Sequence, residues 1–205
     1  MSKLLFLIKY LKYLFVSKTK HGIHSPFVYD LVTNVLNNKS HSQAYTKVRN
    51  LNDIKINSKY LELIYRLITH YKSENILEIN YFENLNRTYL NNFQLKANMF
   101  FCNRETNKIS EIRTQNKIKL ESFDFAFFNI KNNDNLTLNE FMNYLKYFHN
   151  NSIVAINNIH QSKEIEEVWK KIITQKEVTI SIDLFFIGLV FFRKEQVKEN
   201  FIIRF

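Results

Sequence analysis

Residues 74–86 read Glu74-Asn75-Ile76-Leu77-Glu78-Ile79-Asn80-Tyr81-Phe82-Glu83-Asn84-Leu85-Asn86. The apolar residues at the start predict a buried β-strand that ends near an acid, Glu78, and a loop then leads into a helix. A strand, a loop and a helix in this order outline a nucleotide-binding unit, whose loop needs glycines for positive φ angles and close backbone approach to the ligand. This loop has Asn80, Phe82 and Asn84 instead. The sequence therefore predicts a unit whose ligand-contacting surface is filled by side chains.

The composition is that of a folded domain. The chain has 205 residues, of which 45% are hydrophobic, so it can bury a sizeable core. Glycine occurs only 2 times, although glycine usually supplies roughly 7% of residues. Cys102 is the only cysteine, which excludes a disulfide framework and a cysteine-based metal site. We expect a reducing compartment, the cytoplasm.

Short apolar strands alternate with helical patterns through most of the chain. We expect strands at 75–79, 98–102, 124–129 and 152–157, and helices at 83–95, 104–114, 136–148 and 162–175. This alternation predicts an α/β fold, in which a mostly parallel sheet has helices on both faces. An antiparallel pair at 178–183 and 187–193 is expected to complete the sheet.

Helices are also predicted before the first strand. We expect them at about 3–16 and 25–37, the second capped by Ser25 with a proline at its first position. A third helix is expected from Ser58, with an apolar stripe formed by Leu61, Ile64, Leu67 and Ile68. The chain then divides into an N-terminal helical extension, 1–57, and an α/β domain, 58–205.

The first of these helices has apolar residues at helical spacing, namely Leu4, Leu5, Ile8, Leu11 and Phe15. This stripe predicts packing on the domain or on a second copy of the chain. The alternative is a helix that lies on a membrane surface. Lysines interrupt the apolar run, so we expect neither a signal peptide nor a membrane span. Gly22 is expected at a turn position that disfavours a β-carbon.

The chain is basic, with a formal net charge of +10. Such a surplus favours polyanions, including nucleic acids and anionic membranes. The charge is spread along the sequence without an arginine-rich block. A solvated basic surface is therefore favoured over a specific nucleic-acid site.

Four collinear motifs carry a family resemblance: His21-Gly22-Ile23-His24-Ser25-Pro26-Phe27-Val28, the segment Ile159–Trp169, the segment Ile182–Arg193, and Arg204-Phe205. They resemble a bacterial family of class I S-adenosylmethionine-dependent methyltransferase-like proteins. The resemblance implies the methyltransferase variant of the doubly wound fold and S-adenosylmethionine as the cofactor.

The resemblance also implies where a site would lie, and there this chain departs from the family. Family members have acids where this chain has Asn103, Asn129, Asn157 and Asn158. Asparagine keeps a carbonyl acceptor but loses the anionic oxygen that a divalent cation or a general base requires. The implied cofactor positions are Glu78, Asn80, Asn103 and Asn129, and the implied catalytic positions are Asn157, Asn158 and His160. No metal site is expected.

One strand–helix unit of the family is missing. Between the helix expected at 104–114 and the strand expected at 124–129, only 116–122 remains, with Ile118–Leu120 as a relic strand. A parallel crossover needs a dozen or more residues. We therefore expect a sheet that has lost one crossover unit.

These patterns leave three interpretations. The leading one is a methyltransferase-fold protein with a degenerate cofactor site and a binding or structural role, in which His160 holds a loop and Asp124 orients the entry to its strand. The first alternative is an active methyltransferase in which Glu78 contacts the cofactor and His160 assists the substrate. The second is a basic protein that binds nucleic acid or a membrane surface. A homo-oligomer formed through the N-terminal helices fits the first interpretation.

Overall fold

A computed structural model gives the structure of the chain. It describes residues 3–38, 58–79, 97–103, 108–113, 122–128, 130 and 137–205. The predictions for the loop at 80–84, the helix at 83–95 and the relic strand at 118–120 lie outside these residues.

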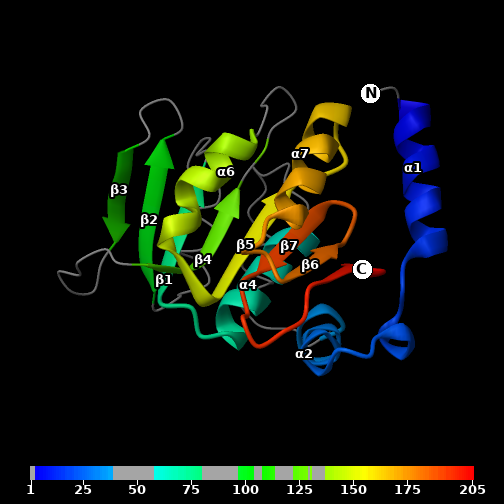
Figure 1. Ribbon diagram of the computed structural model, residues 1–205, viewed down its shortest axis with the longest axis horizontal. Helices are drawn as coiled ribbons and strands as arrows, with labels where there is room; N and C mark the ends of the chain where they lie inside the picture. The colour runs from blue at the N-terminus through cyan, green and yellow to red at the C-terminus, as the bar shows by residue number, and fades with distance from the viewer. Residues whose placement is uncertain are drawn as a thin grey trace.

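The described part of the chain forms an eight-stranded sheet with the order β3-β2-β1-β4-β5-β7-β6-β8 (Figure 1). The strands are β1 (Asn75–Ile79), β2 (Asn98–Asn103), β3 (Lys108–Arg113), β4 (Phe123–Phe128), β5 (Phe148–Asn157), β6 (Ile180–Asp183), β7 (Ile187–Phe191) and β8 (Glu199–Ile202). Strands β2, β1, β4 and β5 are parallel, whereas β7 is antiparallel to both β5 and β6. The strand order reverses beside β1, as in doubly wound folds. The predicted α/β class and the closing antiparallel pair are confirmed.

The edge beyond β2 differs from the prediction. The helix expected at 104–114 is wrong, because Lys108–Arg113 forms β3 and pairs antiparallel with β2. Only residues 104–107 separate the two strands, and so short a connection allows an antiparallel neighbour but no crossover helix. Pairing with the open edge of β2 therefore overrode a helical pattern. The expected loss of a crossover unit concerns residues 116–122, of which only Ser122 is described. The sequence also gave no sign of β8, which pairs with β6.

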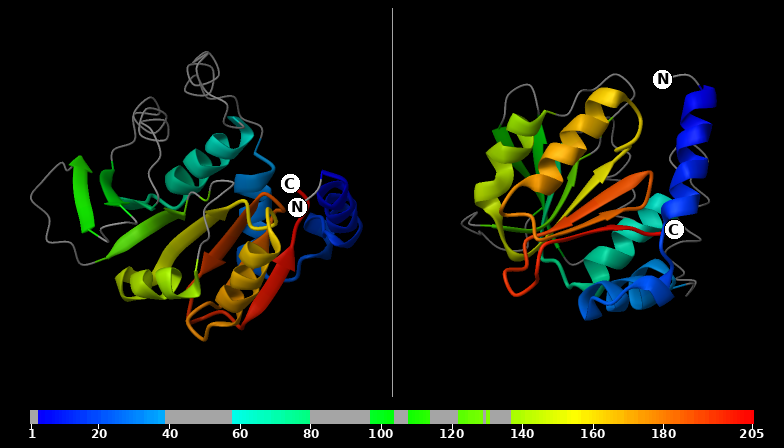
Figure 2. Two further views of the ribbon diagram at one scale, coloured as in Figure 1. Left: turned by 90° about the horizontal axis from the view of Figure 1, so that it is seen from above. Right: turned by 45° about the vertical axis from the view of Figure 1, so that its right-hand side comes forward.

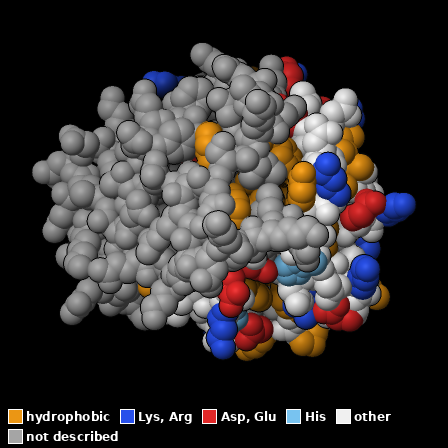
Figure 3. All heavy atoms as spheres, turned by 90° about the vertical axis from the view of Figure 1, so that its left-hand side faces the viewer, with side chains coloured by type: hydrophobic (Ala, Val, Ile, Leu, Met, Phe, Trp, Pro, Cys, Tyr) orange, Lys and Arg blue, Asp and Glu red, His pale blue; other side chains and the backbone are white. Residues whose placement is uncertain are grey.

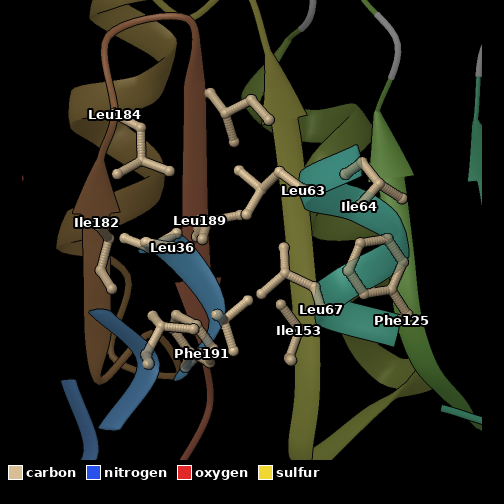
Figure 4. Close-up of a cluster of buried hydrophobic side chains, with 14 of the residues drawn as sticks. Leu36, Leu63, Ile64, Leu67, Phe125, Ile153, Ile182, Leu184, Leu189 and Phe191 are labelled. Carbon is tan, nitrogen blue, oxygen red and sulfur yellow. The ribbon is translucent and has the colours of Figure 1, made fainter. Parts of the chain in front are cut away.

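Helices cover both faces of the sheet (Figure 2). One face packs against α4 (Ser58–His70), α2 (Pro26–Asp30) and the π-helical continuation of α2, η2 (Leu31–Leu36). The other face packs against α6 (Leu138–Tyr144) and α7 (Lys163–Thr174). In Figure 4, side chains of α4 meet those of β4, β5 and β7. The predicted apolar stripe of α4 is buried, as expected: Leu61, Ile64, Leu67 and Ile68.

The second N-terminal helix is close to its prediction. The Ser25 hydroxyl accepts a hydrogen bond from the Val28 amide, and Pro26 is the first helical residue. Leu31 and Val35 are buried in the core that they share with α4 and the sheet. A Ser–Pro start was therefore a sufficient signal for this helix.

The first N-terminal helix, α1 (Lys3–Val16), docks through a face that the sequence did not indicate. The rings of Phe6, Tyr10 and Tyr13 lie 5.2, 4.9 and 5.3 Å from that of Phe185, in the turn between β6 and β7. The predicted stripe instead faces solvent, with Phe15 93% exposed. The prediction that this stripe packs on the domain is wrong, because α1 has two apolar faces and the aromatic one surrounds Phe185.

No helix among the described residues combines the length and the apolar composition of a membrane-spanning segment.

The two glycines have different surroundings. A β-carbon on Gly188, in β7, would lie 2.5 Å from Cζ3 of Trp169, so the Trp169 ring of α7 packs on the bare backbone. A β-carbon on Gly22 would have no neighbour closer than 3.7 Å, at Lys18, and the φ angle of Gly22 is not positive. The prediction that Gly22 disfavours a β-carbon is therefore wrong, and Gly188 has that property.

We expect Gly188→Ala to destabilise the protein by about 1–3 kcal/mol, because the added methyl group overlaps a buried ring that cannot move without disturbing α7. Gly22→Ala is the matched control and should change the stability little. Urea unfolding of both variants measures the difference. Equal midpoints for the two variants would show that the sheet and α7 separate readily.

Candidate functional site

The residues that the resemblance marked as catalytic lie together beyond the C-terminal end of β5. Asn157 is the last residue of β5, and Asn158 and His160 are in the turn that follows. A cavity of about 320 Å³ opens beside them. It is lined by Lys3, Phe6, Asn158, His160, Gln161, Phe185 and Phe186. In doubly wound folds ligands bind beyond the C-terminal strand ends, so this is the candidate site of the described chain.

Both asparagines hold the segment that follows β4. The Asn157 side-chain oxygen accepts a hydrogen bond from the amide of Ile130, and the Asn158 side-chain nitrogen donates to the Ile130 carbonyl at 2.7 Å. Asn158 has a φ of 55°, a left-handed conformation that asparagine tolerates better than most residues. The backbone amide of Asn158 donates a hydrogen bond to the Phe186 carbonyl at 2.6 Å. The two side chains thus join the ends of β4 and β5.

His160 is held by two carboxylates. Its Nε2 lies 2.7 Å from Asp183 Oδ2, and its Nδ1 lies 2.9 Å from Glu166 Oε1. Burial by itself lowers the pKa of His160, but the hydrogen bonds and charges of Asp183 and Glu166 outweigh it, so the pKa is raised above its ordinary value. Both ring nitrogens face acceptors, which is the geometry of an imidazolium that donates twice.

The network extends to α1. Lys9 Nζ lies 2.6 Å from the Glu166 oxygen that His160 contacts. On the other side, Asp183 Oδ1 accepts the amide of Phe185 at 2.7 Å. Phe185 has a φ of 67°, which is strained for a residue with a bulky side chain, and its ring stacks on His160 at 5.0 Å. His160 therefore links the turn after β5, α7 and the β6–β7 turn on which α1 packs.

The positions implied as cofactor contacts are not gathered at this site. Glu78 is 2% exposed and lines a separate, largely apolar cavity with Leu61, Ile64, Phe125 and Phe127, facing α4. Asn103 ends β2, and its side chain lies outside the described part, as do Asn80 and Asn129.

Asp124 has the structural role that the sequence indicated. Its Oδ2 accepts the amides of Glu74 and Asn75 at 2.9 and 2.8 Å, and its Oδ1 contacts His149 Nε2 at 2.9 Å. These contacts join the starts of β1, β4 and β5, at the end of the sheet away from the candidate site.

Sequence reasoning missed three partners in the site: Lys9, Ile130 and Glu166. Glu166 stands in the first turn of α7, where helix capping and the helix dipole already explain an acid. Asp183 lies in the motif Ile182–Arg193, for which the resemblance implied no site residue. Among the described residues, no group of three or more His, Cys, Asp or Glu side chains is arranged to hold a metal ion. The site is thus a hydrogen-bonded junction beside a cavity.

Comparison with known proteins yields similarity of fold only. No family model and no curated protein matches the sequence. Among solved structures, an O-methyltransferase from Bacillus cereus in complex with SAH is 14% identical, with 80% of this chain and 97% of that chain covered and a TM-score of 0.48. The O-methyltransferase TomG from Streptomyces achromogenes, in complex with SAM, is 15% identical, with 81% of this chain and 95% of that chain covered and a TM-score of 0.47. An SAH-bound methyltransferase from Podospora anserina is 10% identical, with 84% of this chain and 98% of that chain covered and a TM-score of 0.46.

We expect Asn158→Asp to destabilise the protein by about 1–3 kcal/mol, because a carboxylate cannot donate to the Ile130 carbonyl and would leave it without that partner. Asn157→Asp is the matched control, since its oxygen can still accept the Ile130 amide. Thermal unfolding at neutral pH compares the two. Aspartate also tolerates a positive φ, so a loss confined to Asn158→Asp identifies the hydrogen bond as the cause, and equal effects contradict it.

The charge on His160 should make the stability depend on pH. Because its pKa is higher in the folded protein than its ordinary value of 6.5, its stabilisation is complete below pH 6.5 and is lost as the pH rises through the folded-state pKa. We expect the free energy of unfolding of the wild type to fall over that interval relative to His160→Gln. Urea unfolding at a series of pH values measures it, and parallel curves for the two proteins would show that His160 is not charged in the fold.

Proposed function

We propose that this chain is a methyltransferase-fold protein that no longer transfers methyl groups and acts as a binding or structural module. The observation that supports this most directly is the double engagement of His160 by Asp183 and Glu166. An imidazolium with both nitrogens donating has no lone pair to accept a proton from a substrate hydroxyl, which a general base must do. His160 is therefore a positioning residue that joins three elements.

The asparagines support the same proposal. Their side chains are bound to the Ile130 backbone in complementary directions, one accepting and one donating. Neutral amides offer no charge to offset the dehydration of Mg²⁺, which usually binds through at least one carboxylate. The positions where the family has acids thus hold the fold together here.

The surroundings of Glu78 also support the proposal. Glu78, the acid at the end of β1, is enclosed by apolar side chains against α4, where a ribose cannot reach it without displacing them. The cavity beside His160 adjoins β5 and α1, with β4 between it and β1.

Calorimetric titration with S-adenosylmethionine, with and without Mg²⁺, tests the proposal. We expect no saturable heat in either case, because the end of β5 presents the amides of Asn157 and Asn158 and a His160 ring whose two nitrogens are already hydrogen-bonded. Thermal unfolding of the same sample verifies that the protein is folded. Saturable binding at micromolar concentration, or formation of S-adenosylhomocysteine from a methyl acceptor, would support the active enzyme instead.

A further inference from the structure

Helix α1 has a second apolar face that nothing in the described chain covers. Its side chains recur at helical spacing and lie opposite the ring-bearing face that docks on Phe185. We name this face the outer stripe; its residues are Leu4, Leu7, Ile8, Leu11 and Phe15, with exposed fractions of 66, 52, 41, 51 and 93%. Clusters of large exposed apolar side chains in folded proteins mark surfaces that bind another surface.

The outer stripe is held in a fixed direction. The Tyr13 hydroxyl donates to the Ile203 carbonyl, and Lys18, just after α1, exchanges backbone hydrogen bonds with Ile202 and Arg204 at 2.8 and 3.0 Å. Lys9 pairs with Glu166 on the side of the helix that faces α7. Figures 1 and 2 show α1 at the outside of the molecule, with its long side exposed. These contacts attach α1 to the domain in one fixed orientation.

The charged side chains that α1 and the residues just after it contribute are all basic. Residues 3–20 contain Lys3, Lys9, Lys12, Lys18 and Lys20 and no aspartate or glutamate. By contrast, acidic and basic side chains lie among each other on the described part of the opposite side of the molecule (Figure 3). An apolar helix face with lysines around it is the pattern of a helix that lies in the interface of an anionic bilayer.

The same charges oppose a second copy as the occupant. A two-fold symmetric contact would bring the outer stripes of two α1 helices together. Each helix carries lysines and no acid, so their charges would repel and none could pair across the contact. Anionic lipid headgroups offer the complementary charge, and the acyl region accepts the leucines and Phe15.

We propose that α1 holds this protein on anionic lipid membranes, with the outer stripe in the headgroup–acyl boundary and Lys12 against the headgroups. Lys12 lies beside the stripe on the exposed side of α1. The docked rings keep the α/β domain attached to the bound helix. This proposal does not require the loss of methyl transfer, because the residues of the outer stripe all belong to α1 and none of them lines the cavity beside His160.

Co-sedimentation of the full chain with vesicles tests the proposal. We expect binding to vesicles of phosphatidylcholine mixed with phosphatidylglycerol, weaker binding at high salt, and little binding to phosphatidylcholine alone. The double variant Leu11→Ser/Phe15→Ser should bind at least about tenfold more weakly, since each side chain loses its burial in lipid. Lys12→Gln should weaken binding about fivefold.

Val197→Ser is the matched control, because Val197 is 74% exposed on the loop between β7 and β8 and should not touch the membrane. Thermal unfolding should be unchanged in all variants, as each side chain is exposed. The proposal is overturned if the wild type stays in solution with anionic vesicles or if the double variant binds like the wild type. It is also overturned if sedimentation equilibrium shows a dimer that the double variant converts to a monomer.

Discussion

The bridge from Asp183 through His160 to Glu166 is the interaction on which this structure depends most. It joins the end of β6, the turn after β5 and the first turn of α7, which meet at the C-terminal ends of β5 and β6. Two carboxylates around one ring raise the pKa of His160 above its ordinary value, although burial opposes them, and partial burial strengthens each hydrogen bond. Because Lys9 shares the Glu166 oxygen, the same network also fixes α1.

The strained Phe185 follows from this bridge. Asp183 binds His160 with one oxygen and the Phe185 amide with the other, which holds the β6–β7 turn in a left-handed conformation. That conformation directs the Phe185 ring between His160 and the aromatic face of α1. Backbone strain in proteins is often connected with function. Here it positions a docking ring, and α1 then presents its outer stripe to the surroundings.

A chemical site and a structural junction make opposite demands on the same residues. A general base needs a free lone pair, and a cation needs an anionic oxygen, whereas a junction needs every donor and acceptor satisfied. His160, Asn157 and Asn158 meet the second requirement through Asp183, Glu166 and Ile130. The hydrogen bonds of His160 thus support the proposed loss of methyl transfer and also contribute to the attachment of α1.

The sequence by itself determined the α/β class, the β1, β2, β4 and β5 strands, the α4 stripe and the Ser25 cap, because periodicity and capping are local signals. Tertiary structure decided what depends on distant partners. The segment 108–113 became a strand since β2 had an open edge, and α1 docked by its rings since Phe185 lay within reach. It also decided the role of His160, because the carboxylates that engage it come from two elements whose meeting no local pattern reveals.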